Sequence, residues 1–177
     1  MKGAAGVLLL AGLVTVSVAT MLGGCQKEKE VDLPFETTER ADLAGTGEYY
    51  KGKEPKLVVV AEAAEIDVLG NTVSLNAQAQ LRNLDFDRYF AIAVFQGWRP
   101  DLPTPQSGVE VQRIGRKKST ITLYARFYEP IEGYERKLVV ISPYHLVKLQ
   151  KEDMRGEFRF ILDVDGATVS QQTHRLL

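Results

Sequence analysis

The chain has 177 residues, with 22 Lys and Arg against 23 Asp and Glu and a formal net charge of −1 at pH 7. This balance argues against a nucleic-acid partner, because nucleic-acid-binding proteins present a strongly basic face. His145 and His174 are the only histidines and Cys25 is the only cysteine, too few ligands for a structural zinc site. We therefore expect no metal. No glycine-rich phosphate loop follows a predicted strand, so we expect no cofactor either.

Residues 1–24 have the layout of an export signal. Lys2 gives a positive start, and an uncharged apolar run follows it up to the small residues before Cys25. The run is also long enough to span a bilayer, so an uncleaved membrane helix is the alternative. Removing this segment takes away Lys2, its only charged residue, and changes the net charge to −2. The remaining residues 25–177 suit a single domain.

The sequence Leu22-Gly23-Gly24-Cys25 resembles the lipobox of bacterial lipoproteins. In that motif the cysteine thiol is alkylated with a diacylglycerol and becomes the new N-terminus, so cleavage is expected after Gly24. An exported protein normally pairs its cysteines or avoids them, and lipidation gives a lone cysteine a use. The resemblance implies a chain anchored in membrane lipid through Cys25, on the extracytoplasmic face of a cell membrane.

The charged stretch that follows predicts a solvated tether over residues 25–32, because its charges are mixed in sign and it lacks apolar periodicity. Residues 33–177 then form the predicted domain. Its first part, residues 33–55, is rich in proline and glycine and is expected to be irregular, with a short strand around Phe35–Arg40.

Short apolar or alternating runs predict a series of β-strands. The run at 89–95 is apolar on both faces, as in a strand buried on both sides. The Gly-Arg-Lys-Lys stretch between the alternating runs at 109–114 and 119–128 suits a hairpin connection. Two further runs flank Pro143, which cannot donate to a ladder and should lie at a bulge or edge. The predicted strands are 56–63, 89–95, 109–114, 119–128, 137–142 and 144–149.

The clearest local prediction is a hairpin at 157–173. Apolar residues alternate from Phe158 to Val164 on one face of its first strand. Asp165-Gly166 follows, a pair that favours a type I′ turn because both central residues need a positive φ.

Residues 72–84 allow two interpretations. Strict alternation predicts a strand that would pair with residues 65–69 across a Gly-Asn turn. The helix formers Ala, Gln, Leu and Arg, with Ser74 as the N-cap, favour instead a short helix at 75–82, which we prefer. In either case we expect a mainly β fold: a single compact antiparallel β-sandwich or barrel-like domain with one or two short helices.

Ser142 and His145 are the residue types that a hydrolytic site would use as nucleophile and base. Three positions apart in a strand, they point to opposite faces unless a bulge at Pro143 resets the alternation. The stretch has no acidic residue and no Gly-x-Ser-x-Gly elbow. We therefore interpret His145 as a packed, hydrogen-bonded residue and expect no enzymatic activity.

The connection at 95–108 holds the only tryptophan and three prolines. The simplest interpretation is a long connection stiffened by proline. Long loops on rigid β scaffolds often carry binding, however, and an adjacent tryptophan and arginine form a common contact pair. The candidate partner-binding residues are Trp98, Arg99, Pro100, Pro103 and Pro105.

Two stretches of the chain form distinctive sequence motifs. The first is Phe95-Gln96-Gly97 with Arg99-Pro100, and the second is Ser142-Pro143-Tyr144-His145-Leu146-Val147-Lys148. The region that contains them, residues 86–150, resembles the protease complex subunit PrcB family. Members usually follow the proline with a Thr-Gly-Gly-Tyr-like turn. Here a longer stretch stands in its place, with Ser107 at the tyrosine position.

The resemblance implies a non-catalytic, exported and lipid-anchored subunit that helps a surface protease complex to form and remain stable. It also implies that Ser142, Pro143, Tyr144 and His145 are a structural motif. We therefore expect a binding module that docks on or stabilises a partner protein, a secreted or surface protease. The alternative is a protease inhibitor that presents the 97–108 loop to an active-site cleft.

Overall fold

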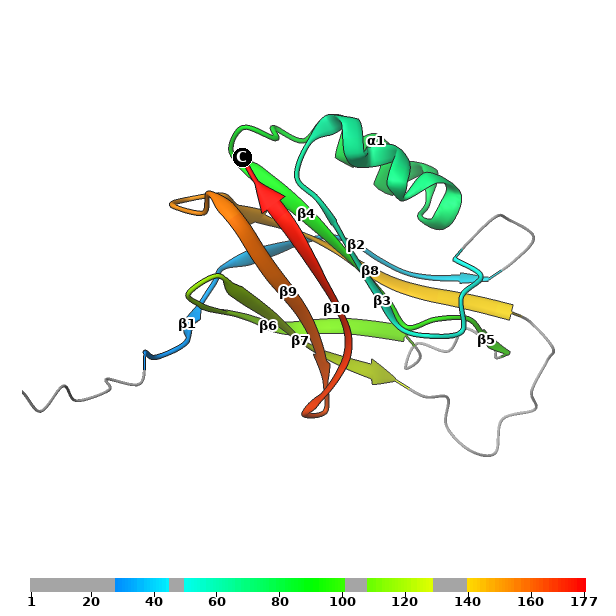
Figure 1. Ribbon diagram of the computed structural model, residues 1–177. Helices are drawn as coiled ribbons and strands as arrows, with labels where there is room; N and C mark the ends of the chain where they lie inside the picture. Colours follow the sequence, from blue (N-terminus) through cyan, green and yellow to red (C-terminus); the bar gives the residue numbers. More distant parts are fainter. Residues whose placement is uncertain (1–27, 45–49, 101–107, 129–139) are drawn as a thin grey trace, which may run out of the picture.

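The computed structural model describes residues 28–44, 50–100, 108–128 and 140–177. These residues fold into two β-sheets packed face to face (Figure 1). Sheet A contains, in spatial order, β1 (Val31–Asp32), β6 (Gly108–Lys117), β7 (Thr120–Tyr128), β9 (Gly156–Val164) and β10 (Ala167–Leu176). Sheet B contains β2 (Phe35–Ala44), β8 (Val140–Gln150), β4 (Tyr89–Phe95) and β3 (Lys56–Val60), and the short β5 (Arg99–Pro100) also pairs with β8. The connection from β3 to β4 holds the 3-10 turns η1 (Ala63–Val68) and η2 (Gly70–Thr72) and the helix α1 (Leu75–Arg82). The expected mainly β fold with a short helix is confirmed.

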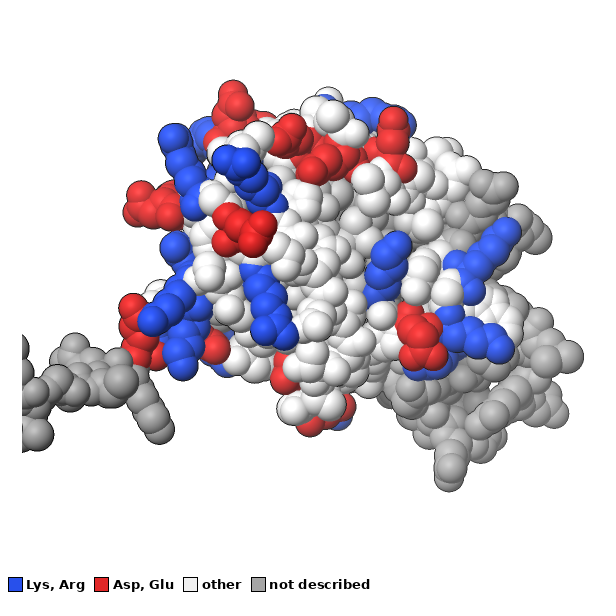
Figure 2. Space-filling view, viewed as in Figure 1, with Lys and Arg blue, Asp and Glu red and all other residues white. Residues whose placement is uncertain are grey.

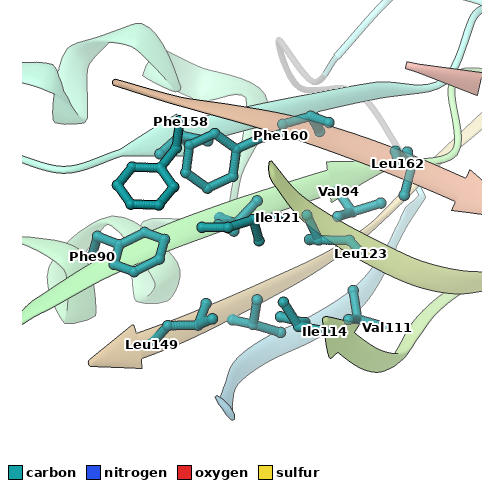
Figure 3. Packing of buried hydrophobic residues seen from close by; sticks show 14 of the residues in the cluster. Phe90, Val94, Val111, Ile114, Ile121, Leu123, Leu149, Phe158, Phe160 and Leu162 are labelled. Carbon is teal, nitrogen blue, oxygen red and sulfur yellow. The ribbon is translucent and has the colours of Figure 1, made fainter. Parts of the chain in front are cut away.

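The main core lies between the two sheets. Period-2 alternation turns Ile121 and Leu123 of β7 inward, and Phe160 of β9 meets them from the neighbouring strand (Figure 3). The rings of Phe90 and Phe160, from opposite sheets, meet edge to face with centroids 6.1 Å apart. This geometry adds to the burial of both rings.

A second core lies on the other face of sheet B, under α1 and η1. Alternate residues of β4 serve the two cores: Phe90 faces the first, whereas Phe95 packs in the second with Leu81 of α1. The expectation of a strand buried on both faces is therefore confirmed for residues 89–95.

Side chains close the seam between edge strands β3 and β10. Ser170 Oγ accepts a bond from the Leu57 N–H at 3.4 Å. The Gln172 amide, oriented to satisfy both groups, donates to the Leu57 carbonyl at 2.9 Å and accepts from the Val59 N–H at 3.2 Å. These contacts satisfy backbone groups of β3 that have no strand neighbour on that side.

The two local predictions with the most specific end signals are confirmed. The helix runs over Leu75–Arg82, and the Ser74 hydroxyl accepts from the Ala77 N–H at 2.9 Å as its N-cap. Asp165 and Gly166 form the turn between β9 and β10 with φ values of 52° and 84°. The alternative hairpin with residues 65–69 is wrong, because that segment lies largely in η1.

One strand pair departs from the expected antiparallel arrangement. β7 pairs with β9 in parallel, Ile121 lying opposite Phe160. The chain leaves sheet A after β7 and runs back along sheet B as β8. It therefore enters β9 in the same direction as β7.

Several strands extend beyond their predicted ends. β2 reaches Ala44, and β6 continues through most of the Gly-Arg-Lys-Lys stretch to Lys117. Pro143 lies at neither a bulge nor a sheet edge, because β8 runs unbroken between β2 and β4. The Pro143 carbonyl accepts from the Gln96 N–H at 3.1 Å, just past the end of β4. An N–H at position 143 would point to the same side as this carbonyl, away from β2. The proline therefore removes no hydrogen bond between β8 and β2.

The expected solvated tether differs from the structure over residues 28–32. Val31 and Asp32 form β1 and pair with Arg116 and Gly115 of β6. Arg113 also binds this segment, with Nη1 2.7 Å from an Asp32 carboxylate oxygen. Cross-strand pairing and ion pairs therefore hold these residues to sheet A, a pattern that mixed charge alone does not reveal.

Candidate functional site

His145 lies between the two sheets and bonds to both. It is 3 % exposed. Its Nδ1 accepts from the Val111 N–H of β6 at 2.8 Å, which places the ring proton on Nε2, 2.9 Å from the Thr37 hydroxyl oxygen of β2. Both strands carry a β-bulge beside these contacts. The ring thus joins sheet B to sheet A at the edge of β6 that carries no strand neighbour around Val111.

The surroundings of His145 favour its neutral form. Burial, together with the Arg40 guanidinium, lowers the pKa of His145 from 6.5 to about 4, against a smaller opposing effect of the Glu110 carboxylate. With both ring nitrogens engaged and a low pKa, His145 is a weak base near neutral pH.

Ser142 and His145 face opposite sides of β8. Val147 and Leu149, in the same alternation as His145, pack in the core between the sheets, whereas Tyr144 packs under α1. The Ser142 hydroxyl is on the Tyr144 side and donates to the Tyr50 carbonyl at 3.0 Å. The two residues that a hydrolytic pair would need are therefore separated by the sheet.

Tyr144 ties helix α1 to β2 through Glu39. Its hydroxyl donates to the Glu39 carboxylate and accepts from the Ser74 N–H at 3.1 Å, next to the helix N-cap. The Glu39 carboxylate also accepts from the Ser74 hydroxyl at 2.5 Å and from the Asn76 amide at 2.6 Å. No pattern in the sequence pointed to Glu39, because it lies 105 positions from Tyr144 and only the fold brings them together.

The electrostatics of this cluster keep both of its titratable groups in their ordinary forms at neutral pH. Burial acts to raise the pKa of Glu39, but hydrogen bonds from Ser74, Tyr144 and Asn76 outweigh it and lower the pKa below 4.5. Burial and the bond to Glu39 raise the pKa of Tyr144 to about 12. Tyr144 therefore remains a donor and Glu39 an acceptor, which suits a structural link.

Replacing Tyr144 by phenylalanine should lower the free energy of unfolding by about 1–3 kcal/mol, because Glu39 and the Ser74 N–H each lose a partner. Chemical denaturation measures this loss. Tyr89→Phe is the matched control, since the Tyr89 hydroxyl has no hydrogen bond within the described chain. Equal losses for the two variants would contradict a structural role for the Tyr144 hydroxyl.

Trp98 and Arg99 lie at the end of sheet B where β5 pairs with the start of β8 (Figure 1). The backbone N–H of Trp98 donates to the Gly52 carbonyl at 2.7 Å. Lys53 Nζ is 5.6 Å from the centre of the Trp98 indole ring, and Trp98 is partly exposed. The Arg99 Nε is buried without a hydrogen-bond partner in the described chain. We call Lys53, Trp98 and Arg99 the Trp98 surface. The sequence analysis missed Lys53, because only the fold brings it to Trp98.

The backbone before Trp98 depends on glycine. Gly97 has a φ of 95°, and a Cβ at this position would collide with the Lys53 carbonyl oxygen. The segment 52–54 and the start of the 97–108 connection therefore approach each other closely, which fixes the position of the Trp98 backbone.

The remaining predicted site residues fall outside the described part of the chain. These are Gly24, Cys25, Pro103 and Pro105; Pro100 is placed only through its backbone, opposite Val140. In residues 28–44, 50–100, 108–128 and 140–177 there is no helix of the length and apolarity needed to cross a membrane. The same residues contain no group of three or more His, Cys, Asp or Glu side chains arranged to hold a metal ion.

A scan against protein-family models finds no match for the chain, and searches of curated proteins and of solved structures find none either. The resemblance to the PrcB family remains a prediction based on the stretches around Trp98 and His145.

Proposed function

We propose that this chain is a non-catalytic, lipid-anchored, extracytoplasmic binding module that docks on or stabilises a partner protein, a secreted or surface protease. The observation that carries the proposal is the Trp98 surface. Its tryptophan backbone is fixed by the bond to Gly52, while its ring is only partly buried beside Lys53 and Arg99.

This arrangement suits protein recognition for two reasons. Tryptophan and arginine are enriched among the residues that contribute most to protein interfaces. A backbone already ordered in the free protein loses less conformational entropy when it binds. The pairing of β5 with β8 places Arg99 on sheet B, and Trp98 directly precedes it, as in many binding loops carried by β scaffolds.

Two lines of evidence support a non-catalytic role. Ser142 and His145 lie on opposite faces of β8, and both nitrogens of His145 are used by Val111 and Thr37. The protease partner and the lipid anchor come from the sequence: the former from the PrcB-like stretches, the latter from Cys25.

A protease inhibitor is the second candidate, favoured by the way the ends of the 97–108 connection are held. Arg99 pairs with Ile141 at one end, and Gly108 pairs with Tyr128 at the other. Canonical presentation of a loop to an active-site cleft needs such fixed ends.

A pull-down from membranes with the acylated chain tests the proposal, with mass spectrometry identifying the captured proteins. Capture of an exported protease that stays active supports a stabilising subunit. Capture of the protease in an inhibited form supports the inhibitor. Recovery of no protease, or a hydrolytic activity of the purified chain that is lost in His145→Gln, would overturn the proposal.

The double variant Trp98→Ala with Arg99→Ala should weaken partner capture at least tenfold, about 1.4 kcal/mol. Its melting temperature should stay within a few degrees, because Trp98 is only partly buried and Arg99 Nε loses no hydrogen bond. Titration of capture and a thermal melt measure the two effects.

A matched control removes one apolar side chain and one arginine elsewhere. Leu75→Ala with Arg82→Ala changes the exposed side of α1, where Leu75 is 81 % exposed, and should leave capture unchanged. A melting temperature lowered by about 10 °C or more in the Trp98 variant would instead identify Trp98 as a core residue.

A further inference from the structure

The N-terminal end of the described chain lies beside the hairpin between β6 and β7. Val31 of β1 pairs with Arg116, almost at the end of β6. The Lys118 ammonium is 3.3 Å from the Glu28 carboxylate. The chain that leads back to Cys25 therefore leaves the domain at the tip of this hairpin (Figure 1).

Specific contacts fix this exit. The Glu30 carboxylate accepts from the Tyr124 hydroxyl at 2.9 Å and lies 2.8 Å from Arg113 Nη1. It passes over Gly115, where a Cβ would collide with it. Residues 30–32 are thus held against sheet A by packing as well as by pairing.

The ion pairs at this exit leave an excess of positive charge. Arg113 and Lys118 are matched by the acidic residues of the N-terminal segment. Four further cations have no acidic partner among the described residues, and we call them the hairpin surface: Lys29, Arg116, Lys117 and Arg159. Figure 2 shows lysine and arginine side chains interspersed with acidic ones at the end of the molecule where the described chain begins, and a further group of basic side chains at the opposite end.

Neutral groups hold two of these cations in place. Arg116 Nε donates to the Lys118 carbonyl at 3.1 Å, and its guanidinium lies 5.2 Å from the centre of the Phe158 ring. Arg159 donates to the Gln171 amide oxygen. Neither contact neutralises the charge, so both guanidinium groups retain it for an external anion. Glu157 is exposed on the same face of β9 as Arg159, so one carboxylate lies beside this surface and reduces its excess of positive charge.

The distance to the anchor is short. Cys25 precedes Glu28 by three residues, which even in a fully extended chain span at most about 11 Å. This is close to the Debye length of roughly 8–10 Å at physiological salt. A lipid on Cys25 would therefore keep the hairpin surface within the electrostatic range of the headgroups.

We propose that the hairpin surface binds the anionic headgroups of the membrane in which Cys25 is anchored, an inference that rests on the lipid anchor of the proposed function. Anionic lipids attract basic side chains held near the bilayer.

The Trp98 surface lies at the opposite end of the strands (Figure 1). The ten residues of β6 separate the two ends by about 30 Å, at about 3.3 Å per residue. The bound hairpin thus directs the Trp98 surface away from the bilayer.

The first experiment measures amine reactivity on vesicles. A chain beginning at Cys25, which keeps every described residue, is coupled through its only thiol to a maleimide lipid. The vesicles are phosphatidylcholine alone or an equimolar mixture with phosphatidylglycerol. A water-soluble acetylating reagent should modify Lys117 about fivefold more slowly on the mixed vesicles. Lys51 and Lys53, at the other end of the molecule, should react equally on both.

The second experiment tests the charges without the coupling. The Cys25→Ser chain should sediment with mixed vesicles at low salt and less at high salt. Lys117→Glu with Arg159→Glu should weaken this binding at least about tenfold, whereas Lys51→Glu with Lys53→Glu should not. Equal reactivity of Lys117 on both vesicle types, or unchanged binding by the Lys117 and Arg159 variant, would overturn the proposal. Absence of lipid labelling at Cys25 in cells would overturn the anchor alone.

Discussion

Acidification from pH 6.5 to pH 4 should remove about 3 kcal/mol of the free energy of unfolding through His145 alone. The unfolded chain takes up a proton at this residue near pH 6.5, whereas the folded chain does so only near pH 4. Because the pKa is lower in the fold, the stabilisation is complete above pH 6.5 and decreases as the pH falls through this window. Denaturant titrations at several pH values measure the slope.

Two variants assign this slope to His145. His145→Gln keeps a hydrogen-bonding side chain but cannot titrate, so most of the slope should disappear, at a cost of about 1–2 kcal/mol at neutral pH. His174→Gln removes the only other histidine and should retain the slope. A His145→Gln chain that is as sensitive to acid as the parent would show that His145 is not the buried neutral link between the sheets.

Replacing Cys25 by alanine should abolish lipid labelling completely and leave the precursor uncut after Gly24. The thiol is the only one in the chain, and alanine offers no nucleophile for a diacylglycerol. Two acyl chains hold a protein stably, since each buried methylene contributes about 0.8 kcal/mol. Metabolic labelling with a fatty acid and the electrophoretic mobility of the chain measure the two effects.

Membrane fractionation would not separate these states, because the uncut precursor keeps the apolar run of residues 1–24. Ser17→Ala, in the same run, is the matched control and should be labelled and processed normally. Normal processing and labelling of the Cys25→Ala chain would contradict the lipobox interpretation and favour an ordinary export signal.

Local signals in the sequence were sufficient for the parts of the fold that depend on near neighbours. Ser74 identified the start of α1, and Asp165-Gly166 identified the last turn, because both act within four residues. The parallel pairing of β7 with β9 has no local signal, since it depends on the path of β8 through the other sheet.

The candidate site shows the same division. Trp98 and Arg99 stood out by residue type, and the structure places Arg99 in β5 with Trp98 directly before it. Their companion on the Trp98 surface, Lys53, reaches Trp98 only through the close approach at Gly97. Likewise, the Thr37 and Val111 partners of His145 follow from bulges in two distant strands, which alternation alone does not predict.

The parallel pair has a consequence for how the chain reaches its folded state. β7 is complete at Tyr128, but its neighbour β9 begins only at Gly156 and the outer strand β10 ends at Leu176. At a synthesis rate of roughly 5–20 residues per second, the edge of β7 stays unpaired for about 2–10 s after it emerges. During this interval the open edge of β7 is exposed to other nascent chains. The C-terminal hairpin of β9 and β10 therefore completes sheet A. Its tight Asp165-Gly166 turn allows both strands to add to β7 as one unit.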